Sequence, residues 1–136
     1  MRVLAVDYGD RRIGLALSDE TATLCGRAWT IEESDFQRAA RLIADEAQIA
    51  GVDRIVLGLP KNMNGSIGPR AEKSIELSEL LRELSGLDVI LWDERRTTVD
   101  AHRILSENNR HGKKRKERID AVAASLILEG YLGSLK

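Results

Sequence analysis

The sequence predicts an α/β protein in which helices flank a mixed sheet of five strands. Short runs rich in β-branched and apolar residues predict strands at 2–8, 13–18, 24–31, 55–59 and 88–92. The first three strands follow one another directly, whereas helical segments separate the later ones, which indicates crossover connections between parallel strands. At 136 residues with 43% hydrophobic content the chain can bury one core, and we expect a single domain over 1–136.

The amino-terminal part predicts a hairpin and one further strand. The run RVLAVDY ends at Gly9, and IGLALS begins four residues later, which is typical of two antiparallel strands joined by a tight turn. The segment from Leu24 to Ile31 predicts a weaker third strand.

The first helix is predicted between Ser34 and Gly51. Ser34 and Gln37 stand in capping-box register, and Gly51 suits the C-terminal stop. Apolar residues recur between them at helical spacing: Phe36, Ala40, Ile43, Ala47 and Ala50. The next strand, 55–59, is continuously apolar and ends at Pro60, which is typical of a buried parallel strand.

A second helix is predicted from Pro69, which suits a first helical turn, to Gly86. Its buried face is predicted from four leucines: Leu77, Leu80, Leu81 and Leu84. The loop 61–68 before it could form a backbone nest for a phosphate, but we favour a plain strand-to-helix connection because Gly- and Asn-rich loops are common there. The short buried strand 88–92 follows this helix.

The last part of the chain predicts two helices around a loop. A threonine, Thr97 or Thr98, can cap a short helix that runs to residue 109. Residues 110–116 are predicted to be loop, and the final helix to begin at about Glu117. That helix is apolar almost all round, which predicts burial on most of its circumference.

Two sheet topologies fit this order of elements, a Rossmann-like one and a ribonuclease-H-like one. A dinucleotide-binding fold would place a Gly-rich turn and a helix directly after the first strand. The predicted hairpin stands there instead, which favours the ribonuclease-H-like topology.

Charge is distributed unevenly along the chain. The whole sequence carries 21 basic and 22 acidic residues, yet the segment 94–118 holds 9 basic and only 4 acidic ones. Such a cationic patch suits an anionic partner.

Composition also excludes several classes of protein. One cysteine, Cys25, excludes an internal disulfide and a cysteine-based zinc site. No segment approaches the ~20 apolar residues of a membrane span, and the N-terminus lacks the features of a signal peptide. We therefore expect a cytoplasmic protein with no membrane partner.

Three acidic positions stand out by context. Asp7 lies near the end of the first strand, where a carboxylate is costly unless it is paired or bound to a cation, although capping of the following turn is an equally good interpretation. Asp93 and Glu94 follow the last strand, at the edge where α/β sheets bind ligands, and only one of them can share a face with Asp7. Both could instead be surface acids paired with the arginines that follow. Asp120 opens the buried final helix, where the helix dipole alone would explain an acid.

Convergence of the three acids would make a cation site. Oxygen ligands suit Mg²⁺ or Mn²⁺, which can activate water and stabilise the leaving oxygen in phosphodiester hydrolysis. The basic run 113–116, flanked by Arg110 and Arg118, directly precedes Asp120 and would bring a phosphate backbone to it, although such a run is more often a solvated loop. With only five aromatic residues, the chain offers poor support for a base-stacking platform.

Four segments, VDYGDRRIGLALSD, IVLGLPKNMNGSIGPRA, WDERRTT and IDAVAASLILEGYL, resemble the four blocks of the YqgF (RuvX) family. The resemblance spans nearly the whole chain. It implies a ribonuclease-H-like fold and a divalent-metal nuclease, in a family described as processing the 5′ end of pre-16S ribosomal RNA. It also implies that Asp7, Glu94 and Asp120 are the catalytic and metal-binding acids, with Asp93 in reserve for the middle role.

The expected partner is nucleic acid, either structured RNA or branched DNA, bound by a monomer or a homodimer. The predicted contacts are cations near the last two acids: Arg95, Arg110, Lys113, Lys114, Arg115, Lys116 and Arg118. Three alternatives to an RNA-processing nuclease remain at this point. They are a Holliday-junction resolvase, a non-catalytic ribosome-assembly factor, and a fragment of a sugar kinase or actin-like ATPase, whose first phosphate loop VDYGDRRIG also resembles.

Overall fold

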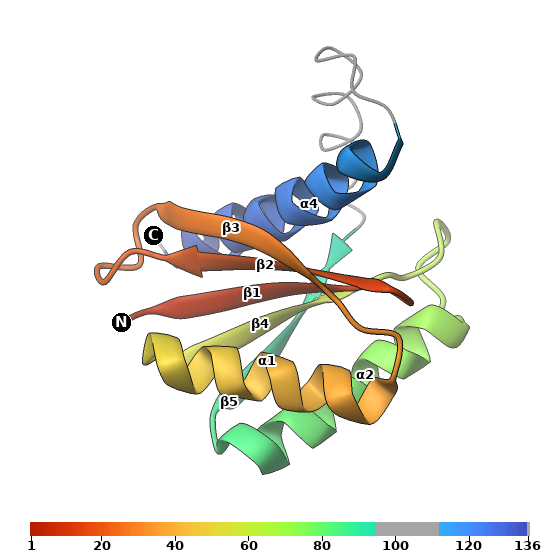
Figure 1. Cartoon of the computed structure of the whole chain (residues 1–136), viewed down its shortest axis with the longest axis horizontal. Coiled ribbons are helices and arrows are strands. Elements are labelled where there is room, and N and C mark those ends of the chain that lie inside the picture. The colour runs from red at the N-terminus through yellow and green to blue at the C-terminus, as the bar shows by residue number, and fades with distance from the viewer. Residues whose placement is uncertain (95–111, 136) are drawn as a thin grey trace.

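A five-stranded mixed sheet forms the centre of the molecule. The computed structural model describes residues 1–94 and 112–135, and for 112–120 it describes the backbone only. The strands are β1 (Val3–Tyr8), β2 (Arg12–Ser18), β3 (Cys25–Glu32), β4 (Arg54–Leu59) and β5 (Asp88–Asp93). Their order across the sheet is β3-β2-β1-β4-β5 (Figure 1). The predicted fold class and all five predicted strands are confirmed.

The two halves of the sheet run differently. β1 pairs antiparallel with β2, and β2 with β3, whereas β1, β4 and β5 are parallel to one another. Parallel neighbours require crossover connections, and α1 (Phe36–Ala50) and α2 (Pro69–Ser85) supply them. The carboxyl ends of β1, β4 and β5 therefore meet at one edge of the sheet.

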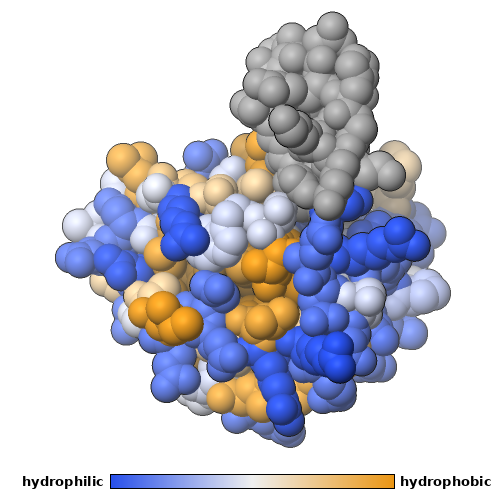
Figure 2. All heavy atoms as spheres, in the orientation of Figure 1, coloured by the Kyte–Doolittle hydropathy of each residue, from blue (hydrophilic) through white to orange (hydrophobic). Residues whose placement is uncertain are grey.

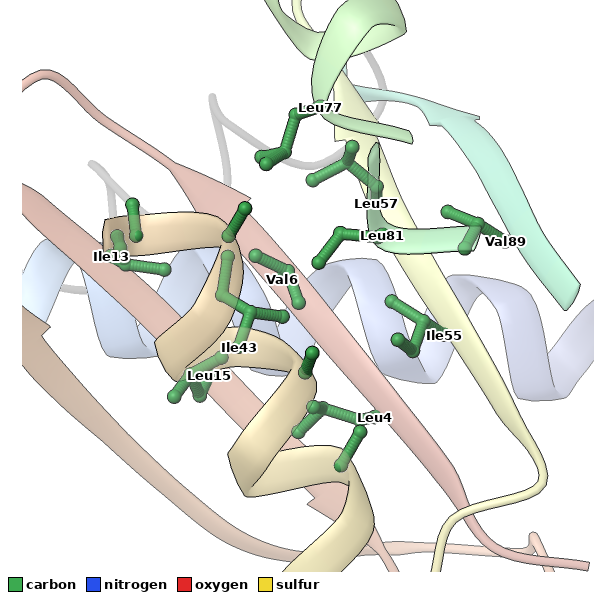
Figure 3. Close-up of a cluster of buried hydrophobic side chains, with 14 of the residues drawn as sticks. Leu4, Val6, Ile13, Leu15, Ile43, Ile55, Leu57, Leu77, Leu81 and Val89 are labelled. Carbon is green, nitrogen blue, oxygen red and sulfur yellow. The ribbon is translucent and has the colours of Figure 1, made fainter. Parts of the chain in front are cut away.

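Helices cover both faces of the sheet. The helices α1 and α2 lie on one face, and α4 (Gly112–Ser134) lies across the other (Figure 1). Strand residues alternate between the faces, so those beneath α1 and α2 form one core. Figure 3 shows this cluster, in which strand residues point toward side chains of both helices. Its labelled members are Leu4, Val6, Ile13, Leu15, Ile43, Ile55, Leu57, Leu77, Leu81 and Val89.

A second, smaller core lies beneath α4. The small side chains of Ala5 and Ala16 face the helix there. The later half of α4 packs on this face through Ala124, Ile127, Leu128, Tyr131 and Leu132. The Tyr131 hydroxyl accepts a hydrogen bond of 2.6 Å from Arg54, which ties the end of α4 to the start of β4.

Of the four residues predicted to begin or end a helix, three are confirmed. Gly51 and Gly86 adopt the left-handed conformation at φ 64° and 70°, and Pro69 begins α2, as predicted. The N-cap of α1 was predicted at Ser34, but the cap is Asp35, whose carboxylate accepts a 2.9 Å hydrogen bond from the Arg38 amide. Both residue types cap well, and Asp35 is the extended residue (φ −80°, ψ 123°) whose carbonyl accepts the first hydrogen bond of the helix, from the Ala39 amide.

Two further predictions were wrong in detail. Leu84 was predicted on the buried face of α2, yet it is 45% exposed, because it lies in the last turn beside an open hollow between the ends of α1 and α2. The final helix begins at Gly112 rather than near Glu117, so residues 112–116 are helical and not loop. Lys and Arg are good helix formers, which explains the longer helix. The helix predicted before residue 109 lies outside the described residues.

Candidate active site

Two acids meet at the carboxyl edge of the parallel strands. Asp7 is in β1 and shares the face of Val3 and Ala5, beneath α4. Glu94 follows β5, and strand alternation places it on the face of Ile90 and Trp92, which also pack against the core beneath α4. The fold therefore brings residues from distant parts of the sequence to one place.

The Glu94 carboxyl is buried and hydrogen-bonded to Asp7. Only 8% of Glu94 is exposed. Burial raises the pKa of Glu94 to about 10, with further contributions from the hydrogen bond to Asp7 and from the negative charge of Asp7. At neutral pH the metal-free protein therefore holds a proton on Glu94, because two charged carboxylates in contact would repel each other.

Gly58 provides the space for this acid pair. It lies in β4, between β1 and β5, and is paired with Trp92. A Cβ atom at Gly58 would overlap the Glu94 carboxyl group, with the Glu94 Cδ only 2.7 Å away. Only glycine leaves room for the observed position of Glu94.

Asp93 lies on the opposite face of the sheet. It is paired with Leu59 and alternates with Glu94, so it belongs to the side of α1 and α2. The structure therefore brings Glu94, and not its neighbour, to Asp7.

Neither capping of the turn by Asp7 nor a surface position for Glu94 agrees with the structure. The turn after β1 is closed by its own backbone, since the Gly9 amide donates to the Arg12 carbonyl at 3.0 Å. The Asp7 side chain bonds to Glu94. Burial of Glu94 likewise does not fit a surface acid.

Asp120 lies in the early part of α4, and its side chain is outside the described residues. The later half of α4 packs over Val3, Ala5 and Val56, so the early half extends toward the carboxyl ends of these strands (Figure 1). Where side chains are described, no third Asp, Glu, His or Cys completes a metal-binding cluster.

The predicted nucleic-acid contacts lie beyond the described side chains. Four of them stand consecutively in the first turns of α4, at 113–116, and Arg118 follows in the same helix. Arg95 and Arg110 lie outside the described residues.

Sequence reasoning missed Arg70, a basic residue of this site. Arg70 stands in the first turn of α2, and its positive charge lowers the pKa of Glu94, in opposition to the burial effect. The sequence contained a signal for it: Pro69 marks the start of a helix that follows a parallel strand, and such a helix begins at the carboxyl edge of the sheet.

The donor set of the site suits a hard divalent cation. Two carboxyl groups in contact supply oxygen ligands, which Mg²⁺ and Mn²⁺ prefer. Their mutual repulsion when ionised would be relieved by a cation, so the residues present fit such an ion.

No helix in the described ranges, 1–94 and 112–135, is long and apolar enough to cross a membrane.

Related proteins cover the chain along its length. A protein of Caldanaerobacter subterraneus subsp. tengcongensis named "Putative pre-16S rRNA nuclease" is 45% identical over 137 residues, which cover 100% of this chain and 99% of that protein. A protein of the same name from Clostridium tetani is 43% identical over 135 residues, covering 99% and 98% of the two chains.

Solved structures resemble the fold as a whole. Thermus thermophilus RuvC in complex with a Holliday junction matches with a TM-score of 0.63 at 10% identity, covering 98% of this chain and 97% of that one. The Fowlpox virus resolvase bound to Holliday junction DNA matches with a TM-score of 0.61 at 16% identity, covering 99% of each chain. The ribonuclease-H-like fold predicted from the sequence is thereby confirmed.

The sequence profile of the RuvX family, described as Holliday junction resolvase, matches residues 1–134. This match over nearly the whole chain assigns it to the RuvX family and not to the sugar kinases or actin-like ATPases. With its fold and its relatives taken together, the chain belongs to the RuvX family of nucleases.

Proposed function

We propose that this nuclease is a divalent-metal-dependent endonuclease that processes the 5′ end of pre-16S ribosomal RNA in the cytoplasm. The observation that carries the proposal is the buried Asp7–Glu94 pair at the carboxyl edge of the sheet. The two relatives named for pre-16S rRNA support the choice of substrate, because they align over essentially their full length.

In this proposal Asp7, Glu94 and Asp120 hold Mg²⁺ or Mn²⁺. Such an ion supplies Lewis-acid stabilisation of the charge that develops in phosphodiester hydrolysis. Glu94 must give up its proton to become a ligand, and the positive charge of Arg70 favours the deprotonated form. Gly58 keeps the space in which the Glu94 carboxyl sits.

The basic start of α4 is the proposed contact for the RNA backbone. Lys113, Lys114, Arg115 and Lys116 stand in its first turns, where the helix dipole also favours anions. Contacts of this kind bind phosphate without reading base sequence. Arg95, Arg110 and Arg118 extend the same proposed surface, on a monomer or a homodimer.

A second candidate substrate is branched DNA. Both solved structures described above are resolvases bound to Holliday junctions, and they match this chain over at least 97% of their length. The fold is therefore compatible with a four-way junction as well as with structured RNA.

One cleavage assay tests both candidates. Purified protein is incubated with a pre-16S rRNA leader fragment or with a four-way DNA junction, in Mg²⁺, in Mn²⁺ or in EDTA. We expect cleavage of the RNA that needs the metal ion and is lost in Asp7→Asn and Glu94→Gln. The matched control is Asp93→Asn, which changes the adjacent acid on the other face of the sheet and should retain cleavage.

The other outcomes are equally informative. Cleavage of the junction alone would replace the RNA substrate by branched DNA. Binding without cleavage of either substrate would contradict the enzyme and favour the non-catalytic assembly factor.

A further inference from the structure

The start of α2 carries two basic side chains on one face. Arg70 and Lys73 are three residues apart in the first turns of the helix, a spacing that places side chains next to each other. Both are exposed. Glu72, the acidic residue of the same turn, is two residues from Arg70 and so points in another direction.

Arg70 lies in the first turn of α2, at the carboxyl edge of the parallel strands where the acid pair lies. The short loop 61–68 connects β4, whose Gly58 touches Glu94, to the start of α2. Across the described part of the chain, the Arg70 guanidinium makes no hydrogen bond or ion pair of its own.

Lys73 lies nearer the end of β1. Its ammonium group is 4.5 Å from the centre of the Phe36 ring. The Phe36 ring in turn packs edge-to-face against Tyr8, the residue after Asp7, with 6.1 Å between ring centres. Both basic residues thus stand at the carboxyl edge of the parallel strands, and Lys73 lies near the end of β1, the strand that carries Asp7.

Hydrogen bonds within the loop before α2 fix the backbone from which these two side chains extend. The Asn62 amide nitrogen donates to Ser66 at 3.0 Å, and the Ser66 hydroxyl donates to Asn64 at 2.6 Å. Gly68, the N-cap of α2, packs against the Asn62 side chain so closely that a Cβ atom would lie 3.2 Å from it. A fixed helix start reduces the entropy lost when Arg70 and Lys73 bind a ligand.

Hydrophilic residues gather over the start of α2 in Figure 2, which views the molecule from the same direction as Figure 1. An exposed guanidinium suits a phosphate, because it can donate two parallel hydrogen bonds to it. An ammonium adds a second point of positive charge for the next phosphate along the strand.

We propose that Arg70 and Lys73 form a second phosphate-binding surface, which holds the nucleic-acid backbone on the α2 side of the acid pair. The inference rests on the proposed function and deepens it. The basic start of α4 would contact the backbone from the other face, so a continuous strand is held on both sides of the reacting phosphate. Phosphate contacts on both sides of the cleaved phosphodiester bond suit an endonuclease.

The test measures binding without cleavage. A fluorescein-labelled RNA hairpin is titrated in EDTA across a series of KCl concentrations with wild type, Arg70→Gln, Lys73→Gln and Arg70→Lys. Each Gln variant should lower the slope of log affinity against log salt by about 0.7 to 0.9 and weaken binding about fivefold at ~0.1 M KCl, as expected for one lost phosphate contact. Arg70→Lys should keep the slope because it keeps the charge.

Arg41→Gln is the matched control, since it removes the same charge from an exposed position on α1. It should keep the wild-type slope. Thermal unfolding of Arg70→Gln should coincide with wild type because Arg70 is exposed, and Lys73→Gln should lose only the small contribution of its exposed cation–π contact with Phe36. Near-native stability of both variants separates a binding role from a structural one.

The outcomes distinguish this inference from the proposed function. If Arg70→Gln and Lys73→Gln keep the wild-type slope, or if wild type does not bind the hairpin, the second surface is refuted even when the enzyme cleaves RNA. If wild type cleaves neither substrate but the slopes fall as expected, the surface stands and the proposed nuclease reaction is wrong.

Discussion

The proton on Glu94 links the stability of the metal-free protein to pH. Its pKa in the folded state is about 10, above its value in the unfolded chain, so its contribution to stability is complete below about pH 4 and is lost as the pH rises toward the folded value. We expect the free energy of unfolding of wild type to fall, relative to Glu94→Gln, by up to about 1.4 kcal/mol per pH unit between these limits.

Urea unfolding in EDTA at several pH values measures this difference. Asp93→Asn serves as the control, because it leaves the buried carboxyl in place and should keep the wild-type dependence. Parallel pH profiles for wild type and Glu94→Gln would mean that Glu94 is already ionised in the folded protein.

The same residues indicate how far a single sequence can locate this site. Asp7 and Glu94 could be selected because strand alternation and the ends of parallel strands are both visible in the sequence. Pro69 places the start of α2 at the same edge, but which residue of its first turn lies toward Glu94 depends on the path of loop 61–68. That path is set by hydrogen bonds among Asn62, Asn64 and Ser66 that no periodicity encodes.

At the level of elements, β4 contributes to the site by lacking a side chain at one position. Gly58→Ala places a methyl group where the Glu94 carboxyl now lies. We expect the carboxyl to be displaced and metal-dependent cleavage to fall by roughly 100-fold, the cost typical of a misplaced reacting group. The matched control is Gly26→Ala in β3, where the nearest atom to a new Cβ lies at an ordinary 3.6 Å. Equal activity of Gly58→Ala and wild type would show that the site tolerates another position of Glu94.

The two glycines of α4 near its end should respond differently to alanine. Gly133 has nothing within 4 Å of a new Cβ, whereas at Gly130 a Cβ would lie 3.0 Å from the Trp92 indole. Gly133→Ala should raise the free energy of unfolding by about 0.5 to 1 kcal/mol through helix propensity. Gly130→Ala should gain less or lose stability, because Trp92 must shift. Urea unfolding of the two variants compares them, and an equal gain in both would contradict the close packing at Trp92.

Element boundaries were less predictable than the elements themselves. The order of strands and helices follows from long hydrophobic patterns, whereas a boundary depends on one or two residues. Ser34 and Asp35 are both competent caps, and only the backbone geometry selects Asp35. The start of α4 at Gly112 was missed because a run of cations was interpreted as loop, although those residues also favour helix.

At the scale of the whole molecule, helices from both faces of the sheet reach the same edge, the carboxyl ends of the parallel strands. The start of α2 and the early part of α4 both lie toward the carboxyl ends of the parallel strands, where Asp7 and Glu94 meet (Figure 1). The topology follows from the alternation of strands and helices in the sequence. The position of a reactive edge could therefore be predicted, but the contacts of its individual cations could not.

A metal ion bound by the acid pair should stabilise the entire fold. An ion that binds only the folded chain stabilises it, by about 2.7 kcal/mol at ~100 times its dissociation constant. Because Glu94 must lose its proton to become a ligand, the affinity for Mn²⁺ should rise with pH, by up to about tenfold per unit below its folded pKa. Thermal unfolding with and without Mn²⁺ at about pH 6 and pH 8 measures the stabilisation. Calorimetry in buffers of different ionisation enthalpy measures the released proton. Glu94→Gln should lose the stabilisation and the proton release, while Asp93→Asn should keep both. An Mn²⁺ affinity independent of pH would show that no proton leaves Glu94 on binding, and full stabilisation of Glu94→Gln by Mn²⁺ would exclude Glu94 as a ligand, whatever the activity of the enzyme.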